Sequence, residues 1–175
     1  MSGCVNPKTI IERLRKGNSF TDEELSSLCV VSLCDKLRAE LRPEDLRMVK
    51  RILQSENTHE ACIGQVLVRP FLYEDGMKEF LIELWKNTNH EYLKAGLLLD
   101  LFEYEDIDNR FIEEAFKFIE DNREIVLRML NEWLEGEDKI VPTIQKKLKG
   151  GKLTSRKTIL YKQILYLTST VYPMV

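Results

Sequence analysis

Two short motifs in this chain have residue types that can hold metal ions. His59-x-x-Cys62 has the spacing closest to a pair of zinc ligands. Zinc needs three or four ligands, and no second pair follows at a suitable spacing. The acidic segment 103–109 suggests calcium, but it lacks the central glycine and closing glutamate of an EF-hand loop. We therefore expect no metal and no cofactor, and we predict that 103–109 is a solvated turn whose Asp108 caps the next helix.

The glycines and lysines of Lys149–Thr154 faintly resemble a phosphate-binding loop. A P-loop needs a preceding strand and Gly-x-x-x-x-Gly-Lys followed directly by serine or threonine, and neither requirement is met. No serine, cysteine or carboxylate pair has a recognisable catalytic setting, and Cys62 fits a core position better than that of a nucleophile. The sequence therefore predicts a protein that is not an enzyme.

Basic residues near the C-terminus are the best candidate for a binding site. From Lys139 onward there are eight basic and no acidic side chains, whereas residues 74–138 carry seven and nineteen, and residues 1–73 eleven and ten. Such segregation produces electrostatic fields of opposite sign, which steer charged partners. The predicted partner-binding residues are Lys146, Lys147, Lys149, Lys152, Arg156, Lys157 and Lys162.

The place of each cation along its predicted helix leaves two interpretations open. A lysine at a helix C-terminus interacts favourably with the helix dipole, by about 0.3–1 kcal/mol, so the first three lysines need no ligand. Arg156 and Lys157 begin the next helix, where a cation is mildly unfavourable, and the dipole does not explain them. The cluster is therefore either a binding patch or a solvated helix end.

Most aromatic residues follow helical stripes and are expected in the core. Phe118 departs from the stripe of its helix and is expected on the surface. Tyr161 and Tyr166 alternate with basic residues, and aromatic and cationic side chains together make effective interface anchors.

Composition is typical of a folded, soluble protein. The 43% hydrophobic and 31% charged residues argue against disorder, and no apolar run approaches the roughly 18–20 residues that span a bilayer. The N-terminus has no basic segment followed by an apolar one, so we expect a cytoplasmic protein and no membrane partner. Four cysteines, expected to be reduced, form no Cys-x-x-Cys pair: Cys4, Cys29, Cys34 and Cys62.

Apolar residues recur at three- and four-residue steps, which predicts an all-α fold. One such stripe consists of Ile159, Leu160, Ile164, Leu165 and Leu167. Asn6 before Pro7 fits a helix N-cap, and Thr21 with Glu24 has capping-box spacing. Helices are predicted over 6–17, 21–41, 43–55, 58–69, 76–88, 90–104, 108–120, 122–135, 138–149 and 153–170.

A weak internal repeat suggests that these helices stack. Thr58-His59-Glu60 opens one helix, and Asn89-His90-Glu91 opens another thirty-one positions later, with apolar residues in matching places. A period of thirty-odd residues carried by paired helices is typical of an α-solenoid. The chain resembles HEAT-like (armadillo-type) helical-repeat proteins over residues 43–170, on the segments Thr58–Val68, Asn89–Phe102 and Asn122–Leu134.

The resemblance implies an α-α superhelix of about five stacked helical hairpins. The expected organisation is a single domain, 1–175, with capping helices in 1–42 and repeat hairpins in 43–170. Such arrays usually offer one face to another macromolecule, so we expect a non-enzymatic interaction module or scaffold. An acidic or phosphorylated protein partner would suit the basic residues.

Two other functions remain open at this point. Nucleic-acid binding through the basic C-terminal hairpin is the alternative, although the net charge of −3 and the acidic middle of the chain oppose it. An enzyme or cofactor-attachment factor, as in certain HEAT-like families, would need a pocket with convergent polar groups, and no motif predicts one. The oligomeric state is not predicted.

Overall fold

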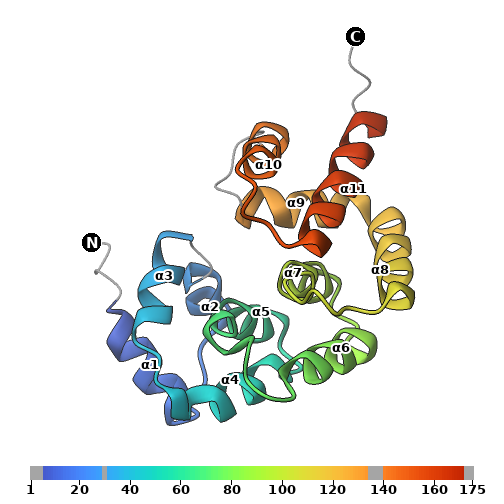
Figure 1. Cartoon of the computed structure of the whole chain (residues 1–175). Coiled ribbons are helices and arrows are strands. Elements are labelled where there is room, and N and C mark those ends of the chain that lie inside the picture. The colour runs from blue at the N-terminus through green and yellow to red at the C-terminus, as the bar shows by residue number, and fades with distance from the viewer. Residues whose placement is uncertain (1–5, 29–30, 134–139, 172–175) are drawn as a thin grey trace. The chain divides into compact units, whose positions relative to one another are not determined.

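The computed structural model describes residues 6–28, 31–133 and 140–171, and these residues form helices and turns without a strand (Figure 1). The predicted all-α class is confirmed for this part of the chain. The α-helices and the 3-10 turns η1 and η2 are α1 (Pro7–Arg15), α2 (Asp22–Leu28), α3 (Val31–Ala39), η1 (Pro43–Asp45), α4 (Leu46–Leu53), α5 (Thr58–Leu67), η2 (Arg69–Phe71), α6 (Met77–Asn87), α7 (Glu91–Leu101), α8 (Asn109–Asp121), α9 (Arg123–Trp133), α10 (Ile140–Lys149) and α11 (Ser155–Val171).

Three predicted helices differ from the observed ones in more than their end residues. The predicted helix 21–41 corresponds to α2 and α3, and the intervening residues 29–30, which include Cys29, lie outside the described residues. The predicted helix 43–55 opens with the tighter turn η1 before α4 begins. The predicted helix 58–69 ends earlier and continues as η2, because Pro70 has no N–H to extend the hydrogen bonds of α5.

Local capping chemistry sets the helix starts as predicted. The side chain of Asn6 accepts a hydrogen bond from the backbone N–H of Lys8 at 3.0 Å. The backbone N–H of Glu24 donates to Thr21 Oγ1 at 3.2 Å, and the N–H of Thr21 donates to Glu24 Oε2 at 2.8 Å, which completes the capping box. Gly17 ends the first helical segment with a φ of 72°, in the left-handed region where glycine has no steric cost.

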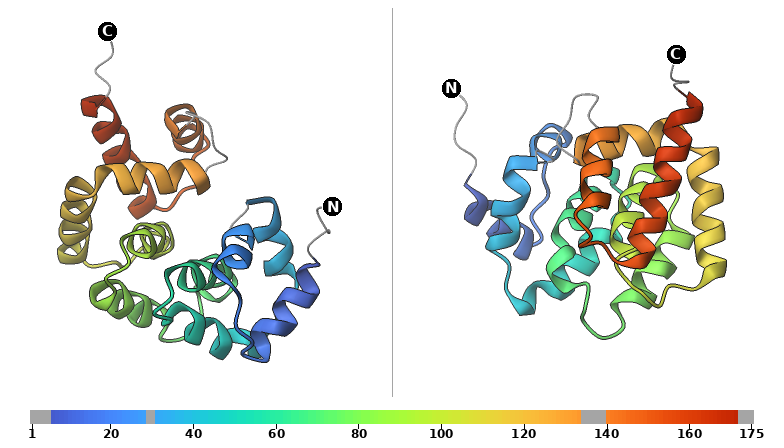
Figure 2. Two further views of the ribbon diagram at one scale, coloured as in Figure 1. Left: turned by 180° about the vertical axis from the view of Figure 1, so that it is seen from behind. Right: turned by 45° about the horizontal axis from the view of Figure 1, so that its top comes forward.

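The chain divides into two compact units, unit 1 (Met1–Phe80) and unit 2 (Leu81–Val175), and the division falls inside α6. The central helix of unit 1 is α5, which packs against α4 and also contacts α2 and α3 (Figure 2). Gly64 permits the close approach of α4, since a Cβ there would lie 2.8 Å from the backbone nitrogen of Leu53. The core of unit 1 is therefore built around α5.

The central helix of unit 2 is α7, which packs against α9. Most of this helix is buried, and its buried residues are Leu93, Ala95, Gly96, Leu97, Leu98, Leu99, Asp100 and Leu101. In turn α9 packs against α8 and α10, and α10 packs against α11. Helices α5 and α7 are two of the helices that the weak sequence repeat aligns, and each lies at the centre of its own unit.

An aromatic cluster in unit 2 corrects the expectation for Phe118. Its ring is half-buried and meets Trp85 edge-on, with ring centroids 5.6 Å apart. The ammonium of Lys94 lies 4.2 Å from the Trp85 ring centroid and 5.1 Å from that of Phe118. Phe118 leaves the main stripe of α8 because it covers Trp85 and Lys94, and not because it faces solvent.

Candidate binding surfaces

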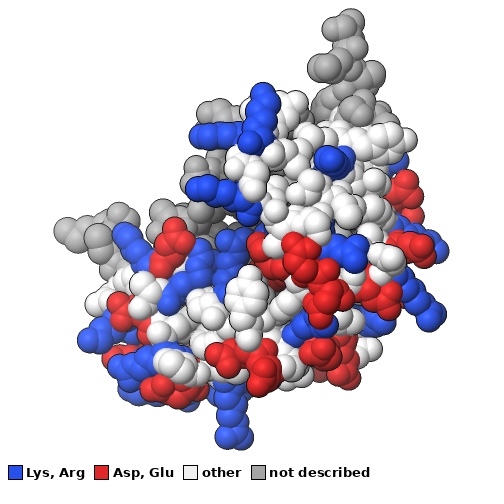
Figure 3. All heavy atoms as spheres, viewed as in Figure 1, with Lys and Arg blue, Asp and Glu red and all other residues white. Residues whose placement is uncertain are grey.

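Five of the seven predicted partner-binding residues are exposed in unit 2. Lys146, Lys147 and Lys149 lie in the last turn of α10, where they are compatible with the helix dipole. Lys152 lies in the turn to α11, and Lys162 lies about two turns along that helix. Lys and Arg side chains stand out on the surface over α10 in Figure 3.

Arg156 and Lys157, the two residues that the helix dipole does not explain, are held by the fold instead. Lys157 is buried and its ammonium forms an ion pair with the Glu103 carboxylate. Arg156 donates from Nε to the backbone carbonyl of Glu105 and from a terminal nitrogen to Asn109 Oδ1, each at 3.2 Å. These cations therefore bind the acidic turn (residues 103–109) of the same unit, and Lys157 in particular is not on the surface.

The first turn of α11 is also fixed to the acidic turn by hydrogen bonds. The hydroxyl of Thr154 donates to the backbone carbonyl of Phe102 at 2.9 Å. The backbone N–H of Ser155 donates to Glu105 Oε1 at 2.9 Å, and its hydroxyl bonds to the other carboxylate oxygen. These bonds, together with the charge of Arg156, lower the pKa of the Glu105 carboxyl. The acidic turn is thus partly a docking point for α11, and not only a solvated turn.

The acidic turn caps two helices, one that follows it directly and one that begins far along the chain. Asp108 accepts a hydrogen bond from the N–H of Arg110 at 2.9 Å, so the predicted cap of α8 is confirmed. Glu105 caps α11 from a position fifty residues earlier. Sequence reasoning finds the first cap because it is local, whereas the second is visible only in the fold.

The outer face of α11 combines apolar and cationic side chains. Ile159 and Tyr166 are 38% and 59% exposed, and the exposed Lys162 lies between them. The spacing of three and four residues places all three on one side of the helix. Tyr161, by contrast, is buried. Ile159 therefore does not belong to the core stripe that the sequence predicts, and only one of the two tyrosines can contact a partner.

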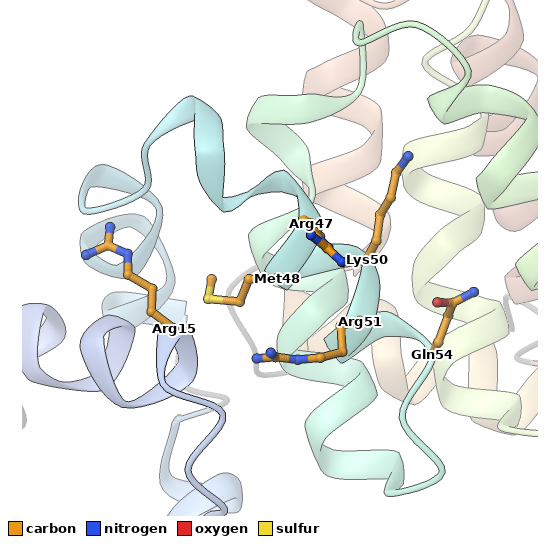
Figure 4. A pocket seen from close by; sticks show the side chains of 6 residues that line it. All are labelled: Arg15, Arg47, Met48, Lys50, Arg51 and Gln54. Atoms are coloured by element: carbon orange, nitrogen blue, oxygen red, sulfur yellow. The ribbon is translucent and has the colours of Figure 1, made fainter.

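A second basic surface, not predicted from the sequence, surrounds a hollow of about 830 Å³ in unit 1 (Figure 4). Its lining contains four cations and no carboxylate. We call this site the α4 hollow, and its lining residues are Arg15, Arg47, Met48, Lys50, Arg51 and Gln54. The sequence carries a signal for this surface, since Arg47, Lys50 and Arg51 of α4 and Gln54 directly after it follow helical spacing, i, i+3, i+4 and i+7.

The cations of the α4 hollow differ in how they are held. Arg15 places Nε and a terminal nitrogen on the two oxygens of Asp45, both at 2.8 Å, and this contact holds the pKa of the buried Asp45 carboxyl below its usual range. Arg51 extends toward α1 and donates to the backbone carbonyl of Leu14 at 2.8 Å (Figure 4). Arg47 is exposed. The guanidinium of Arg15 is thus engaged within the fold, while that of Arg51 keeps further donors available.

The part of the chain that the structure describes contains no assembled metal-binding site. Within residues 6–28, 31–133 and 140–171, no group of three or more His, Cys, Asp or Glu side chains could hold a metal ion. His59 is exposed and Cys62 half-buried, while burial raises the pKa of the Cys34 thiol. Cys4 and Cys29 lie outside the described residues. None of the described helices is long and apolar enough to cross a bilayer.

No protein-family model, curated protein or solved structure matches this chain. The resemblance to HEAT-like repeat proteins therefore stays a hypothesis.

Proposed function

We propose that this protein is a non-enzymatic interaction module that binds an acidic partner protein through the exposed side of the α10–α11 hairpin. The observation that carries the proposal is the row of Ile159, Lys162 and Tyr166 along α11, in which two large apolar side chains flank a cation. Interface anchors commonly combine aromatic area with positive charge. A HEAT-like stack of helical hairpins is the architecture proposed with this function.

The lysines at the end of α10 supply long-range attraction in this proposal. Lys146, Lys147 and Lys149 are exposed, and the described residues of α10 and α11 carry no carboxylate side chain. Exposed cations of this kind raise the association rate with an acidic surface more than they strengthen the final complex. We expect complex formation to weaken as the salt concentration rises, because ions screen charges separated by more than about 8–10 Å.

The test compares two variants that carry the same change in charge. In K146E/K149E the reversed charges lie on the proposed surface, while in K86E/K117E they lie on exposed lysines of α6 and α8 in the same unit. Affinity capture from native lysate should recover a protein with wild type and K86E/K117E, and should lose that same protein with K146E/K149E and with Tyr166→Asp. Equal recovery with all four chains would refute the proposal.

Nucleic acid is the second candidate, since the same lysines could contact a phosphate backbone. It predicts that a labelled single-stranded oligonucleotide is retarded by wild type at about 50 mM salt, with a steep loss of affinity at higher salt. It also predicts that nuclease treatment of the lysate removes the captured material. Capture that survives nuclease, with no retarded oligonucleotide, favours the protein partner.

A further inference from the structure

We propose that the acidic partner of the α10–α11 hairpin is a second copy of this chain, which docks through the exposed turn around Tyr73. We call this segment the Tyr73 turn (residues 72–76), and it joins η2 to α6. The inference rests on the function proposed above, because it assigns a partner to the same face of α11. In the assembly, the Tyr73 turn of one copy contacts the row of Ile159, Lys162 and Tyr166 on the next copy.

The Tyr73 turn holds an aromatic ring out in solvent. Among the large hydrophobic side chains of the described residues, Tyr73 is the most exposed, at 81%. The residues that flank the turn are buried, with Leu72 5% exposed and Met77 0%. The backbone N–H of Glu74 donates to the carbonyl of Phe71, and that of Met77 donates to the carbonyl of Glu74, each at 3.1 Å. A ring presented by a fixed turn loses little entropy on binding, which suits an interface anchor.

The Tyr73 turn also carries the charge that the α10–α11 hairpin lacks. Glu74 and Asp75 follow Tyr73 directly and are exposed, and residues 72–76 contain no cation. The next cation along the chain, Lys78, forms an ion pair with Glu79 at 3.6 Å. The described residues of α10 and α11 carry cations and no carboxylate side chain. The two surfaces are therefore complementary in charge, which favours their encounter.

The spacing of the row on α11 suits one aromatic ring beside one cation. Ile159 and Tyr166 are seven residues apart, which corresponds to about 10 Å along a helix. In the proposed contact the ring of Tyr73 lies between these two side chains and covers the apolar stem of Lys162. The two carboxylates of the Tyr73 turn then face the ammonium of Lys162. The contact combines an apolar centre with matched charges at its edge.

Charge also decides the symmetry of the contact. A twofold dimer through α11 would place lysines against lysines, and one through the Tyr73 turn would place carboxylates against carboxylates. The contact therefore joins two different surfaces, and each copy offers both of them. Contacts of this type continue from copy to copy, into a ring or an open chain. One turn on one helix face makes a small interface, so we expect association only at high protein concentration.

Sedimentation velocity of the full chain tests for this association. At about 25 mM salt the mean sedimentation coefficient should rise between about 10 µM and about 500 µM protein, and at about 500 mM salt the rise should be lost. Tyr73→Ala and Tyr166→Asp should each weaken association at least about tenfold, whereas Tyr73→Phe, which keeps the ring, should associate like wild type. Circular dichroism establishes that each variant is folded. A sedimentation coefficient of wild type that does not change with concentration would overturn the proposal.

A mixture of two variants tests whether the contact joins two different surfaces. Tyr73→Ala keeps the row on α11, and Tyr166→Asp keeps the Tyr73 turn, so each variant has one intact surface. Alone, each should remain monomeric. Mixed, they should form a complex with one copy of each variant that grows no further. Association of wild type without any association in the mixture would contradict the proposal.

The capture experiment described above separates failure of this inference from failure of the proposed function. If wild type stays monomeric while K146E/K149E loses a different captured protein, the hairpin binds another partner and only the second copy is refuted. If K146E/K149E changes neither self-association nor capture, both proposals are wrong. Self-association that is lost in K146E/K149E and kept in K86E/K117E supports the second copy as the partner.

Discussion

Arg15 in unit 1 and Lys157 in unit 2 each join two distant segments by an ion pair, but the buried member differs. In unit 1 the carboxylate is buried, with 5% of the Asp45 side chain exposed against 24% for Arg15. In unit 2 the cation is buried, with 5% of the Lys157 side chain exposed against 30% for Glu103. Removing the more exposed partner leaves the other charge in a poorly solvated place. The two pairs therefore identify Arg15 and Lys157 as basic residues that serve the fold.

The largest loss of stability is expected when the buried Lys157 loses the carboxylate of Glu103. Glu103→Ala should lower the free energy of unfolding by about 3 kcal/mol, because the Lys157 ammonium stays buried without the carboxylate. Urea denaturation at neutral pH measures the change. Glu103→Ala combined with Lys157→Met should recover part of the loss. A double variant that is less stable than Glu103→Ala would contradict the stated cause.

In unit 1 the corresponding change acts on the buried carboxylate itself. Asp45→Asn should lower the free energy of unfolding at pH 7 by about 2 kcal/mol, since two charge-assisted hydrogen bonds from Arg15 are weakened. The pKa of Asp45 is held below its usual range, chiefly by the Arg15 hydrogen bonds. This stabilisation is complete above the unfolded-state pKa, about 3.9 for aspartate, and is lost as the pH falls through the folded-state value.

The pH dependence isolates Asp45 from other carboxylates. Urea denaturation at several pH values between about 7 and 2 should show the stability difference between wild type and Asp45→Asn shrinking in acid. A difference that stays constant over this range would show that the carboxylate charge of Asp45 does not stabilise unit 1.

Close packing of α5, the central helix of unit 1, predicts a loss of stability of intermediate size. Gly64→Ala places a Cβ 2.8 Å from the backbone nitrogen of Leu53, so α4 must move. The expected net loss is about 1–2 kcal/mol, because overpacking outweighs the better helix propensity of alanine. Gly150→Ala is the matched control, since the nearest atom to its Cβ would lie 3.4 Å away. Equal stabilities of the two variants in urea would contradict the close approach of α4 and α5.

The smallest loss of stability is expected from removing the N-cap of α2 at Thr21. Thr21→Ala should cost about 1 kcal/mol, because the N–H of Glu24 loses its acceptor at the start of α2. Thermal unfolding followed by circular dichroism detects such a change. Thr21→Ser keeps the hydroxyl and should restore most of the stability. If the serine variant were as unstable as the alanine variant, the cap would not be the cause.

The parts of the fold that follow from neighbouring residues could be predicted from the sequence. The capping box of Thr21 and Glu24, the cap at Asp108 and the all-α class depend on residues a few positions apart, and each is confirmed. The role of Lys157 could not be predicted, because its partner Glu103 lies fifty-four residues away. The charge of a side chain is visible in a sequence, whereas its partner depends on the tertiary fold.

The candidate sites could likewise be predicted only in part from the sequence. The exposed lysines at the end of α10 were predicted from charge alone, and their role in binding stays a prediction. The α4 hollow was missed because Arg47, Lys50 and Arg51 are interspersed with core residues, so no run of charge marks them. Helical spacing alone identifies these residues as one face, and the hollow itself depends on Arg15 from another helix.

Partner capture by two lysine variants tests whether outward-facing and inward-facing cations have different roles. K146E/K149E and Lys157→Met should be compared under conditions in which circular dichroism shows both to be folded. We expect the first to lose the protein recovered by wild type and the second to keep it, because Lys157 is buried. Retention by K146E/K149E together with loss by Lys157→Met would contradict the assignment of roles.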